Sequence, residues 1–235
     1  MKFNCINCLF VLFVYVLLPC EFPLSQTEIH SYNFNQYIQI DNIDSRLLEK
    51  AFIYFTNMER KSRGLRQLKE DSLLAVSARS HSKEMSTLNY FSHESPVEQN
   101  KTLQQRYKNS GVFMENIVIG ENIGVDFILD ISGIEFFTKV RNGKKVYING
   151  TTRKAILPQT YRQFASTMVK RWMKSPHHRE NILRKRFEKI GMGIAKGKYK
   201  GLDAIYVTQN FSGTFVQGYK KKWIILDHNL KIRGQ

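Results

Sequence analysis

No cysteine occurs after residue 20 of this 235-residue chain, so the part beyond that point folds without an intramolecular disulfide. The three cysteines are Cys5, Cys8 and Cys20. A chain of this length can bury one sizeable core, or at most two small ones. We therefore expect a domain that is held together by packed helices and strands alone.

The first 20 residues have the composition of an export signal. Lys2 supplies a positive charge, and residues 9–18 are apolar and uncharged. This run is shorter than the about 20 apolar residues that a membrane-spanning helix needs, which favours a signal peptide over residues 1–20 and an exported remainder, either secreted or associated with the cell envelope. Cys20 could carry a lipid anchor, but Pro19 stands where a lipidation signal has a small residue. The alternatives for this segment are cleavage, a retained N-terminal membrane anchor, or a lipid anchor on Cys20.

The chain is strongly basic, with a formal net charge of +16. One interpretation is an ordinary solvated surface. The other is attraction to an anionic envelope component, either a polymer or lipid headgroups. Nucleic acid is not expected as a partner, because the chain is predicted to be exported and contains no RNA- or DNA-binding motif.

Two helices are predicted after a polar segment, residues 21–43, which we interpret as an N-terminal linker or a loosely docked strand. The first begins at Asp44, a good N-cap, and Gly64 is placed to end it. The second follows Asp71, and its apolar residues recur at helical spacing on one face. They are Leu74, Ala78, His81, Met85 and Leu88. Because His81 lies on this face, we interpret it as a core histidine with a local hydrogen bond rather than as a ligand.

Thr160 and Gln163 form the sequence pattern of a capping box, which predicts a third helix. Ser175-Pro176 then predicts the start of a further short helix, with the serine as N-cap and the proline at the first helical position. This places His178 in the first turn of that short helix.

Strands are predicted between and after these helices. Asn142-Gly143 is a typical two-residue turn, so residues 136–148 are predicted to form a hairpin. Residues 190–194 and 204–211 indicate two strands that residues 196–203 join, and residues 222–226 indicate a final edge strand. Helices that flank a small sheet indicate one layered α/β domain of the α+β type.

Five short motifs follow one another along the chain. They are Asn57-Met58-Glu59-Arg60; Tyr90-Phe91-Ser92-His93; Gly120-Glu121-Asn122-Ile123; Trp172-Met173-Lys174-Ser175 with His178; and the closing segments Ile190-Gly191-Met192-Gly193 and Tyr206-Val207-Thr208-Gln209-Asn210-Phe211. In this order they resemble the CAP superfamily, also called SCP or cysteine-rich secretory protein domains, and in particular its bacterial, disulfide-free branch. The resemblance covers residues 44–215, with residues 136–148 as an inserted hairpin, and leaves residues 216–235 as a C-terminal extension. It implies a three-layer α-β-α sandwich with a small mixed, mostly antiparallel sheet.

The resemblance also implies a site. His93 and His178 would converge in a surface cleft and bind Zn²⁺ or a similar divalent cation, because neutral imidazole suits such ions. Glu121 would orient a metal-bound water or hydrogen-bond the ligand shell. Ser175 stands where other members of the superfamily have a second cleft glutamate, so the affinity for metal should be lower here.

Asn122 is expected to satisfy buried backbone groups under the cleft. Of the adjacent pair His177 and His178, the second is expected to face inward, because neighbouring positions on a helix do not face the same way. Arg106 is expected on a solvated, salt-bridging face, together with the other arginines near the ends of the cleft.

Three functions follow as alternatives, and whether the protein is an enzyme stays undecided. The leading hypothesis is a binding module for a lipid, a glycan or a protein, at the cell envelope or outside the cell. The second is a zinc-dependent hydrolase, a peptidase or an esterase, with Glu121 as general base. The third is a secreted interaction factor with a vestigial cleft, whose polar groups form only a hydrogen-bonded brace. We expect the hairpin over residues 136–148 to border the cleft.

Overall fold

The structure is a computed structural model that describes residues 32–131 and 133–214. Its contacts divide the chain into two units, residues 1–32 and residues 33–235, and every helix and strand named below lies in the second. The predicted signal peptide, the three cysteines and the strand predicted over residues 222–226 lie outside the described residues.

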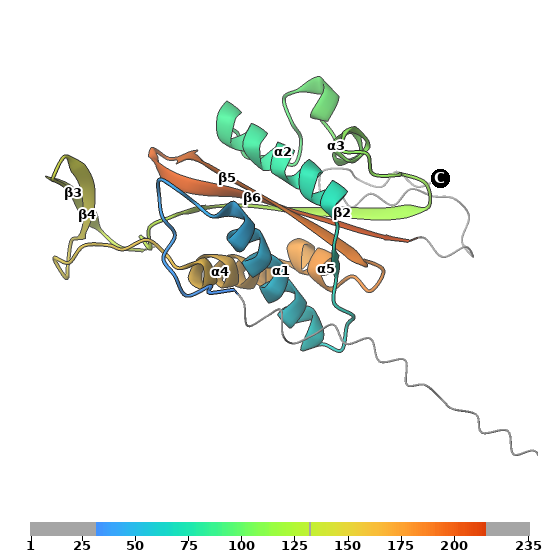
Figure 1. Ribbon diagram of the computed structural model, residues 1–235, viewed down its shortest axis with the longest axis horizontal. Helices are drawn as coiled ribbons and strands as arrows, with labels where there is room; N and C mark the ends of the chain where they lie inside the picture. The colour runs from blue at the N-terminus through green and yellow to red at the C-terminus, as the bar shows by residue number, and fades with distance from the viewer. Residues whose placement is uncertain (1–31, 132, 215–235) are drawn as a thin grey trace, which may run out of the picture. The chain divides into compact units, whose positions relative to one another are not determined.

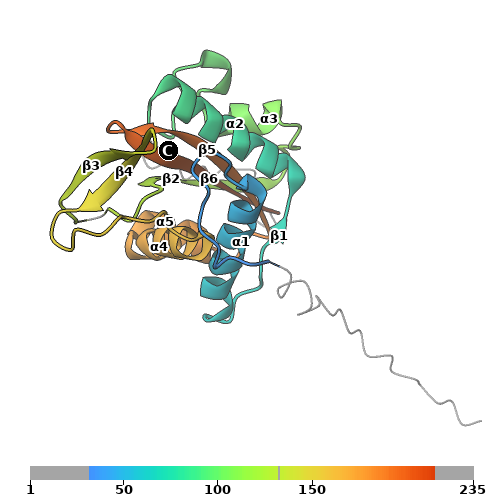
Figure 2. The ribbon, with the colours of Figure 1, turned by 60° about the vertical axis from the view of Figure 1, so that its left-hand side comes forward.

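A four-stranded sheet forms the middle layer, with helices on both of its faces (Figure 1). Its strands stand in the order β1 (Lys69–Glu70), β5 (Lys189–Tyr199), β6 (Leu202–Thr214), β2 (Ile117–Phe127). β1 runs parallel to β5, and the other neighbouring pairs are antiparallel. One face is covered by α1 (Ser45–Lys61), α4 (Tyr161–Lys174) and α5 (Pro176–Leu183) (Figure 2). The other face is covered by α2 (Ser72–Leu88) and α3 (Leu103–Asn109). A 3₁₀ turn over Glu98–Asn100 precedes α3. The predicted three-layer α-β-α sandwich with a mixed, mostly antiparallel sheet is therefore confirmed.

The helices begin where local capping satisfies their first backbone N–H groups. The Asp44 side chain accepts a hydrogen bond from the backbone N–H of Leu47 at 2.9 Å, and Asp71 does the same for the first turn of α2. At α4, Thr160 and Gln163 form both halves of the predicted capping box. The helix starts expected at these three positions are thus confirmed.

Two expected details differ. Leu88, predicted on the apolar face of α2, is 49% exposed, because the buried part of that face ends at Met85. Ser175 does occupy the N-cap position of α5, with Pro176 behind it, but its side chain makes no capping hydrogen bond.

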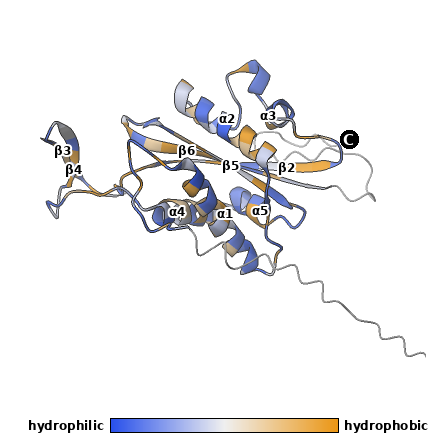
Figure 3. Ribbon diagram, viewed as in Figure 1, coloured by the Kyte–Doolittle hydropathy of each residue, from blue (hydrophilic) through white to orange (hydrophobic). Residues whose placement is uncertain are grey.

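The two faces of the sheet are packed differently. Between the sheet and α1 and α4 lies a core of large side chains in which the ring of Phe52 lies 6.2 Å from that of Phe164 and 5.7 Å from that of Trp172. Figure 3 shows the hydrophobic colour on β2, on part of β6 and on turns of α2. On the opposite face, a Cβ added at Gly193 would lie 2.0 Å from the carbonyl carbon of Ala78. The backbone of α2 therefore lies directly on β5, which only a residue without a side chain permits.

The hairpin predicted at Asn142-Gly143 is present, as β3 (Phe136–Arg141) and β4 (Lys144–Asn149). Both turn residues have positive φ, 50° and 71°, as a type I′ turn requires. These strands pair with one another in a separate sheet, and Figures 1 and 2 show the hairpin projecting at the end of the main sheet opposite to α3.

Residues 33–43, which the sequence assigned to a linker or a loosely docked strand, carry part of the core. Phe34 is 5% exposed and Ile38 is fully buried. The backbone N–H of Ile38 donates to the carbonyl of Gln159 at 2.9 Å, just before α4. Over the part of the chain that the structure describes, no helix is both long enough and apolar enough to cross a membrane.

Candidate functional site

The site is built around strand β2, whose successive residues face opposite sides of the sheet. A Cβ added at Gly120 would contact Phe187 and Asn181, so this position faces α5. Glu121 faces the other way, where its carboxylate meets Arg106 of α3. Asn122 faces α5 again. The family motif thus divides its side chains between the two sides of the sheet.

Glu121 and Arg106 form a buried ion pair. Nη2 of the arginine lies 2.9 Å from each carboxylate oxygen, and the two residues are only 4% and 3% exposed. Arg106 also donates from Nη1 to the carbonyl oxygens of Asn100 and Lys101, at 3.0 and 3.3 Å. The expectation that Arg106 lies on a solvated face is wrong, because α3 turns it inward beside Leu103 and Tyr107.

A sequence signal for Arg106 did exist. Thr102 and Gln105 form a capping box, which marks the start of a short helix. In that helix, Leu103, Arg106 and Tyr107 occupy positions separated by three and four residues, and these positions share one face.

His93 is the second partner of Glu121. Its Nδ1 lies 2.9 Å from Oε1 of the carboxylate, and its side chain is partly exposed. Burial alone would raise the pKa of Glu121, but the Arg106 guanidinium together with the hydrogen bond from His93 lowers it to about 2. The carboxylate is therefore ionised at neutral pH and stays an acceptor for the imidazole.

The loop that carries His93 is held by a second carboxylate, that of Glu84. It accepts hydrogen bonds from the hydroxyl of Tyr90 at 2.6 Å, from the amide of Asn100 at 2.8 Å and from the hydroxyl of Ser95. These donors lie on both sides of His93 in the sequence. The position of the imidazole is thus fixed by α2 below the loop and by Glu121 beside it.

His81 has the structural role predicted for it. It is 1% exposed, and its Nε2 lies 3.1 Å from the carbonyl oxygen of Ser92. Burial lowers its pKa to about 4, in spite of the nearby Glu121 carboxylate, which opposes that shift. The ring is therefore neutral at pH 7 and anchors the residue that precedes His93.

His178 reaches the site through its backbone. The amide of Asn122 donates to the carbonyl oxygen of His178 at 3.2 Å and to Oε1 of Gln209 at 3.1 Å. The amide of Asn181 donates to the carbonyl oxygen of Glu121 at 3.0 Å. These bonds fasten α5 to β2. The ring of His178 is partly buried with its centroid 6.4 Å from that of Trp172, whereas His177 is exposed and Ser175 is partly buried.

The donor set fits a divalent cation in part. A metal-ligating histidine commonly has its other ring nitrogen bonded to a carboxylate, and the Glu121 bond to Nδ1 of His93 supplies this arrangement. Glu121 itself is committed to Arg106 and His93, so it would support a ligand rather than act as one. In the described ranges, no group of three or more His, Cys, Asp or Glu residues is placed to hold a metal ion. Of the two histidines expected as ligands, His93 lies beside Glu121 on the side of β2 that faces α3, and His178 lies in the first turn of α5, on the other side of that strand.

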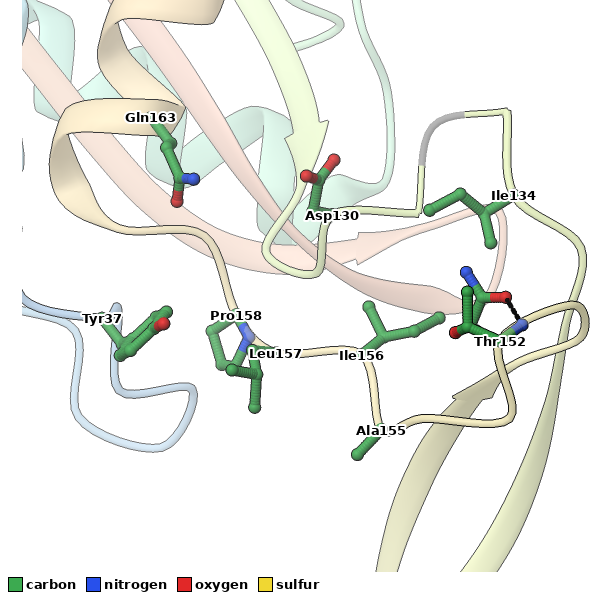
Figure 4. Close-up of a pocket in the computed structure, with 10 residues that line it drawn as sticks. Tyr37, Asp130, Ile134, Thr152, Ala155, Ile156, Leu157, Pro158 and Gln163 are labelled. Atoms are coloured by element: carbon green, nitrogen blue, oxygen red, sulfur yellow. Dashed lines mark hydrogen bonds between the residues drawn. The ribbon is translucent and has the colours of Figure 1, made fainter.

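A pocket of about 260 Å³ lies elsewhere, and no predicted site residue lines it. Figure 4 shows its walls: Tyr37 on one side, Ile156, Leu157 and Pro158 along the floor, and the polar groups of Asp130 and Gln163 above. The pocket is thus separate from the His93 and Glu121 pair.

A model of the cysteine-rich secretory protein family (CAP) matches residues 53–211. YkwD, an uncharacterized protein of Bacillus subtilis (strain 168), is 29% identical over 153 residues, which are 63% of this chain and 42% of that protein. The chain therefore spans less than half the length of this relative.

Two solved structures match part of this chain. An extracellular protein containing an SCP domain from Bacillus anthracis str. Ames has a TM-score of 0.45 and 26% identity, and the match covers 71% of this chain and 40% of that one. An outer surface protein of Borrelia burgdorferi has a TM-score of 0.47 and 18% identity, with 73% and 96% covered.

Proposed function

This chain belongs to the cysteine-rich secretory protein (CAP) family, and from that premise we propose that it is an exported binding module whose cleft is braced by a divalent cation, Zn²⁺ or a similar ion, on His93 and His178. The family predicted from the five motifs is confirmed. The metal, the export and the binding role are our proposal.

The observation that carries the proposal is the chain of contacts Arg106–Glu121–His93. The buried guanidinium holds the carboxylate, and the carboxylate holds Nδ1 of the imidazole at 2.9 Å. An imidazole fixed in this way presents Nε2 as its metal-binding nitrogen in a single orientation. Such rigid support for one partly exposed histidine is what a ligand position needs.

Each residue has a distinct part in this proposal. His93 and His178 would be the direct ligands, and Asn122 positions the second by holding its backbone carbonyl at the start of α5. Ser175 and His177 would line the approach without binding the ion. When bound, the cation would supply a positive centre for an oxygen of the ligand. The ligand classes that we propose are a lipid, a glycan or a protein of the cell envelope.

The alternative of a zinc-dependent hydrolase is weakened by the state of Glu121. A general base works best when its pKa lies near the working pH. The pKa of Glu121 is about 2, and both of its oxygens accept hydrogen bonds from Arg106. A hydrolytic reaction in this cleft would therefore need another base.

The test is a calorimetric zinc titration of residues 33–235, the unit that holds the whole described fold. We expect saturable binding of one ion, which His93→Ala and His178→Ala each abolish. His177→Ala is the matched control, because it removes an exposed neighbouring imidazole and should leave the binding unchanged. Absence of saturable binding by the folded wild-type protein, or binding that survives His93→Ala, would overturn the proposal.

A further inference from the structure

Positive charge is concentrated in one stretch of the chain. The 44 residues from Phe136 to Arg179 contain eleven lysines and arginines and no aspartate or glutamate. The acidic residues Glu135 and Glu180 border this stretch on either side. In a chain of net charge +16, the stretch is the main source of positive charge.

The charges on α4 are partly engaged by other side chains. Arg171 forms an ion pair with Asp126, and Nε of Arg162 donates to the amide oxygen of Asn35 at 2.7 Å. The hairpin and the loop after it differ. Five exposed cations there take part in no ion pair within the described part of the chain: Lys139, Arg141, Lys145, Arg153 and Lys154.

Two of these cations are held against an aromatic ring. Nζ of Lys139 lies 5.5 Å and the guanidinium carbon of Arg153 lies 5.4 Å from the centre of the Phe137 ring. Contacts of this kind hold the aliphatic stems along the ring while the charged heads remain in water. The cations are therefore presented on a defined surface.

The tip of the hairpin adds an exposed apolar side chain. Val140 is 74% exposed and lies opposite Lys145, two residues before the Asn142-Gly143 turn. Figure 3 shows hydrophobic and hydrophilic segments side by side on this hairpin. Lys145 shares the face of the hairpin that carries Val140, whereas Lys139 and Arg141 lie on its other face, because successive strand residues face opposite sides. A tip with an exposed aliphatic side chain and cations on both faces suits tip-first entry into a lipid interface, where the headgroups are anionic and the layer beneath them is apolar.

We propose that the β3–β4 hairpin is a docking arm for a lipid bilayer that carries anionic phospholipids, with Lys139, Arg141 and Lys145 on the headgroups and Val140 at the apolar boundary. A bilayer is favoured over a soluble anionic polymer because a polymer would use the cations and would leave Val140 without a role. The arm projects at the end of the sheet opposite to α3, the helix whose Arg106 holds Glu121 (Figures 1 and 2). The inference is independent of the proposed cation.

The experiment is sedimentation of residues 33–235 with vesicles, because this unit contains the described core and lacks the apolar N-terminal run. One set of vesicles is phosphatidylcholine alone, and the other is phosphatidylcholine with an equal amount of phosphatidylglycerol. We expect binding to the anionic vesicles only. The Lys139→Gln/Arg141→Gln/Lys145→Gln variant should weaken it at least about tenfold, since each basic residue near an anionic surface adds to the attraction.

A matched variant removes the same charge elsewhere. Lys61, Lys83 and Lys185 are exposed on the body of the domain and form no ion pair in the described structure, and their triple replacement by glutamine should leave most of the binding intact. Val140→Ser keeps every charge and should weaken binding several-fold. Far-UV circular dichroism and thermal unfolding check that each variant is folded.

Three results would overturn the proposal. The first is equal binding to both kinds of vesicle. The second is an equal loss in the two triple variants, which would mean that net charge alone is responsible. The third is that a soluble polyanion, such as long-chain polyphosphate, binds as tightly as the anionic vesicles, and that Val140→Ser changes the affinity for neither of them. This result would assign the hairpin to a polymer.

Discussion

Glu121 stabilises the fold as well as supporting His93, and this governs how its variants behave. Glu121→Gln would leave the buried Arg106 guanidinium without its counter-charge. Breaking a buried pair from one side costs about 3–5 kcal/mol. We therefore expect a loss of this size in the free energy of unfolding, measured by urea denaturation of residues 33–235.

The control for this prediction removes both charges together. Arg106→Met with Glu121→Leu replaces the pair by apolar side chains, and it should recover most of the stability that Glu121→Gln loses. If Glu121→Gln had the same midpoint of urea unfolding as the wild-type protein, the ion pair between Arg106 and Glu121 would not stabilise the fold as proposed. One consequence concerns function: reduced ligand binding in Glu121→Gln does not by itself identify a catalytic base.

His81 makes the free energy of unfolding depend on pH, and it does so at higher pH than the carboxylates, which titrate near pH 4. Its pKa is about 4 in the folded protein against an ordinary value of 6.5, so the unfolded chain takes up this proton first. The stability that the neutral His81 ring contributes is present in full above about pH 6.5. It is lost as the pH falls to about 4, and the free energy of unfolding then decreases by about 3 kcal/mol. Urea denaturation at steps between these pH values measures the loss.

Replacement of His81 isolates this effect. In His81→Gln the fall in stability between about pH 6.5 and 4.5 should disappear, because carboxylates in the unfolded chain titrate at lower pH. Below that range Glu121, whose pKa is lowered from 4.5 to about 2, should still cause a loss in both proteins. An unchanged slope in His81→Gln would show that another group is responsible.

The sequence predicts individual site residues unevenly. His93 and Glu121 could be named because they lie in motifs, and His81 could be assigned to the core because it lies on an apolar helical face. Arg106 could not be assigned to Glu121, because their contact joins a short helix to a strand 15 residues later and depends on how both pack. The low pKa of Glu121 follows from that packing, so it too was beyond the sequence.

At the scale of elements, the close approach of α2 to the sheet is set by glycines of β5. Gly193→Ala would place a Cβ 2.0 Å from the backbone of Ala78, and backbone cannot move aside as a side chain can. We expect a loss of about 3 kcal/mol or more in stability, at or above the upper end for overpacked cores. Thermal unfolding of residues 33–235 measures it.

Gly124→Ala is the matched control, because it adds the same methyl group to another strand of this sheet. There the Cβ would lie 2.4 Å from the sulfur of Met168, which is part of a flexible side chain. The cost should be smaller, about 1 kcal/mol. Equal costs in the two variants would contradict the special role of Gly193.

Most elements with local signals were predicted, although α3 was missed in spite of its capping box, and strand β2, which depends on distant partners, was missed as well. The caps of α1, α2 and α4 and the turn of the β3–β4 hairpin lie within a few residues of what they define. Strand β2 has an irregular pattern, because Gly120 faces Phe187, Gly124 faces Met168, and polar residues lie between the two glycines. Its pairing with β6 joins residues about ninety positions apart, for example Glu121 with Asn210, and no local rule indicates such a pair.

At the scale of the whole molecule, the boundary of the folded domain lies before residue 44. From their polar, non-periodic sequence, residues 21–43 were interpreted as a linker or a loosely docked strand. Within it, however, Phe34 and Ile38 are buried against the core, and the backbone pairs with the chain before α4. Two isolated apolar residues in a polar segment give no periodic signal, although they are enough to dock it.

This docking predicts that a chain that begins at residue 44 is less stable than one that begins at residue 33. Full burial of a phenylalanine or isoleucine side chain contributes about 1.5–3 kcal/mol. Loss of both should lower the free energy of unfolding by about 3–6 kcal/mol, as an upper range because the unfolded chain already buries part of this surface. Phe34→Ala/Ile38→Ala in the longer chain should reproduce most of the loss, whereas Tyr37→Ala, at a position that is 49% exposed, should change little. Equal stability of the two chains would mean that residues 33–43 do not stabilise the domain and act as a linker.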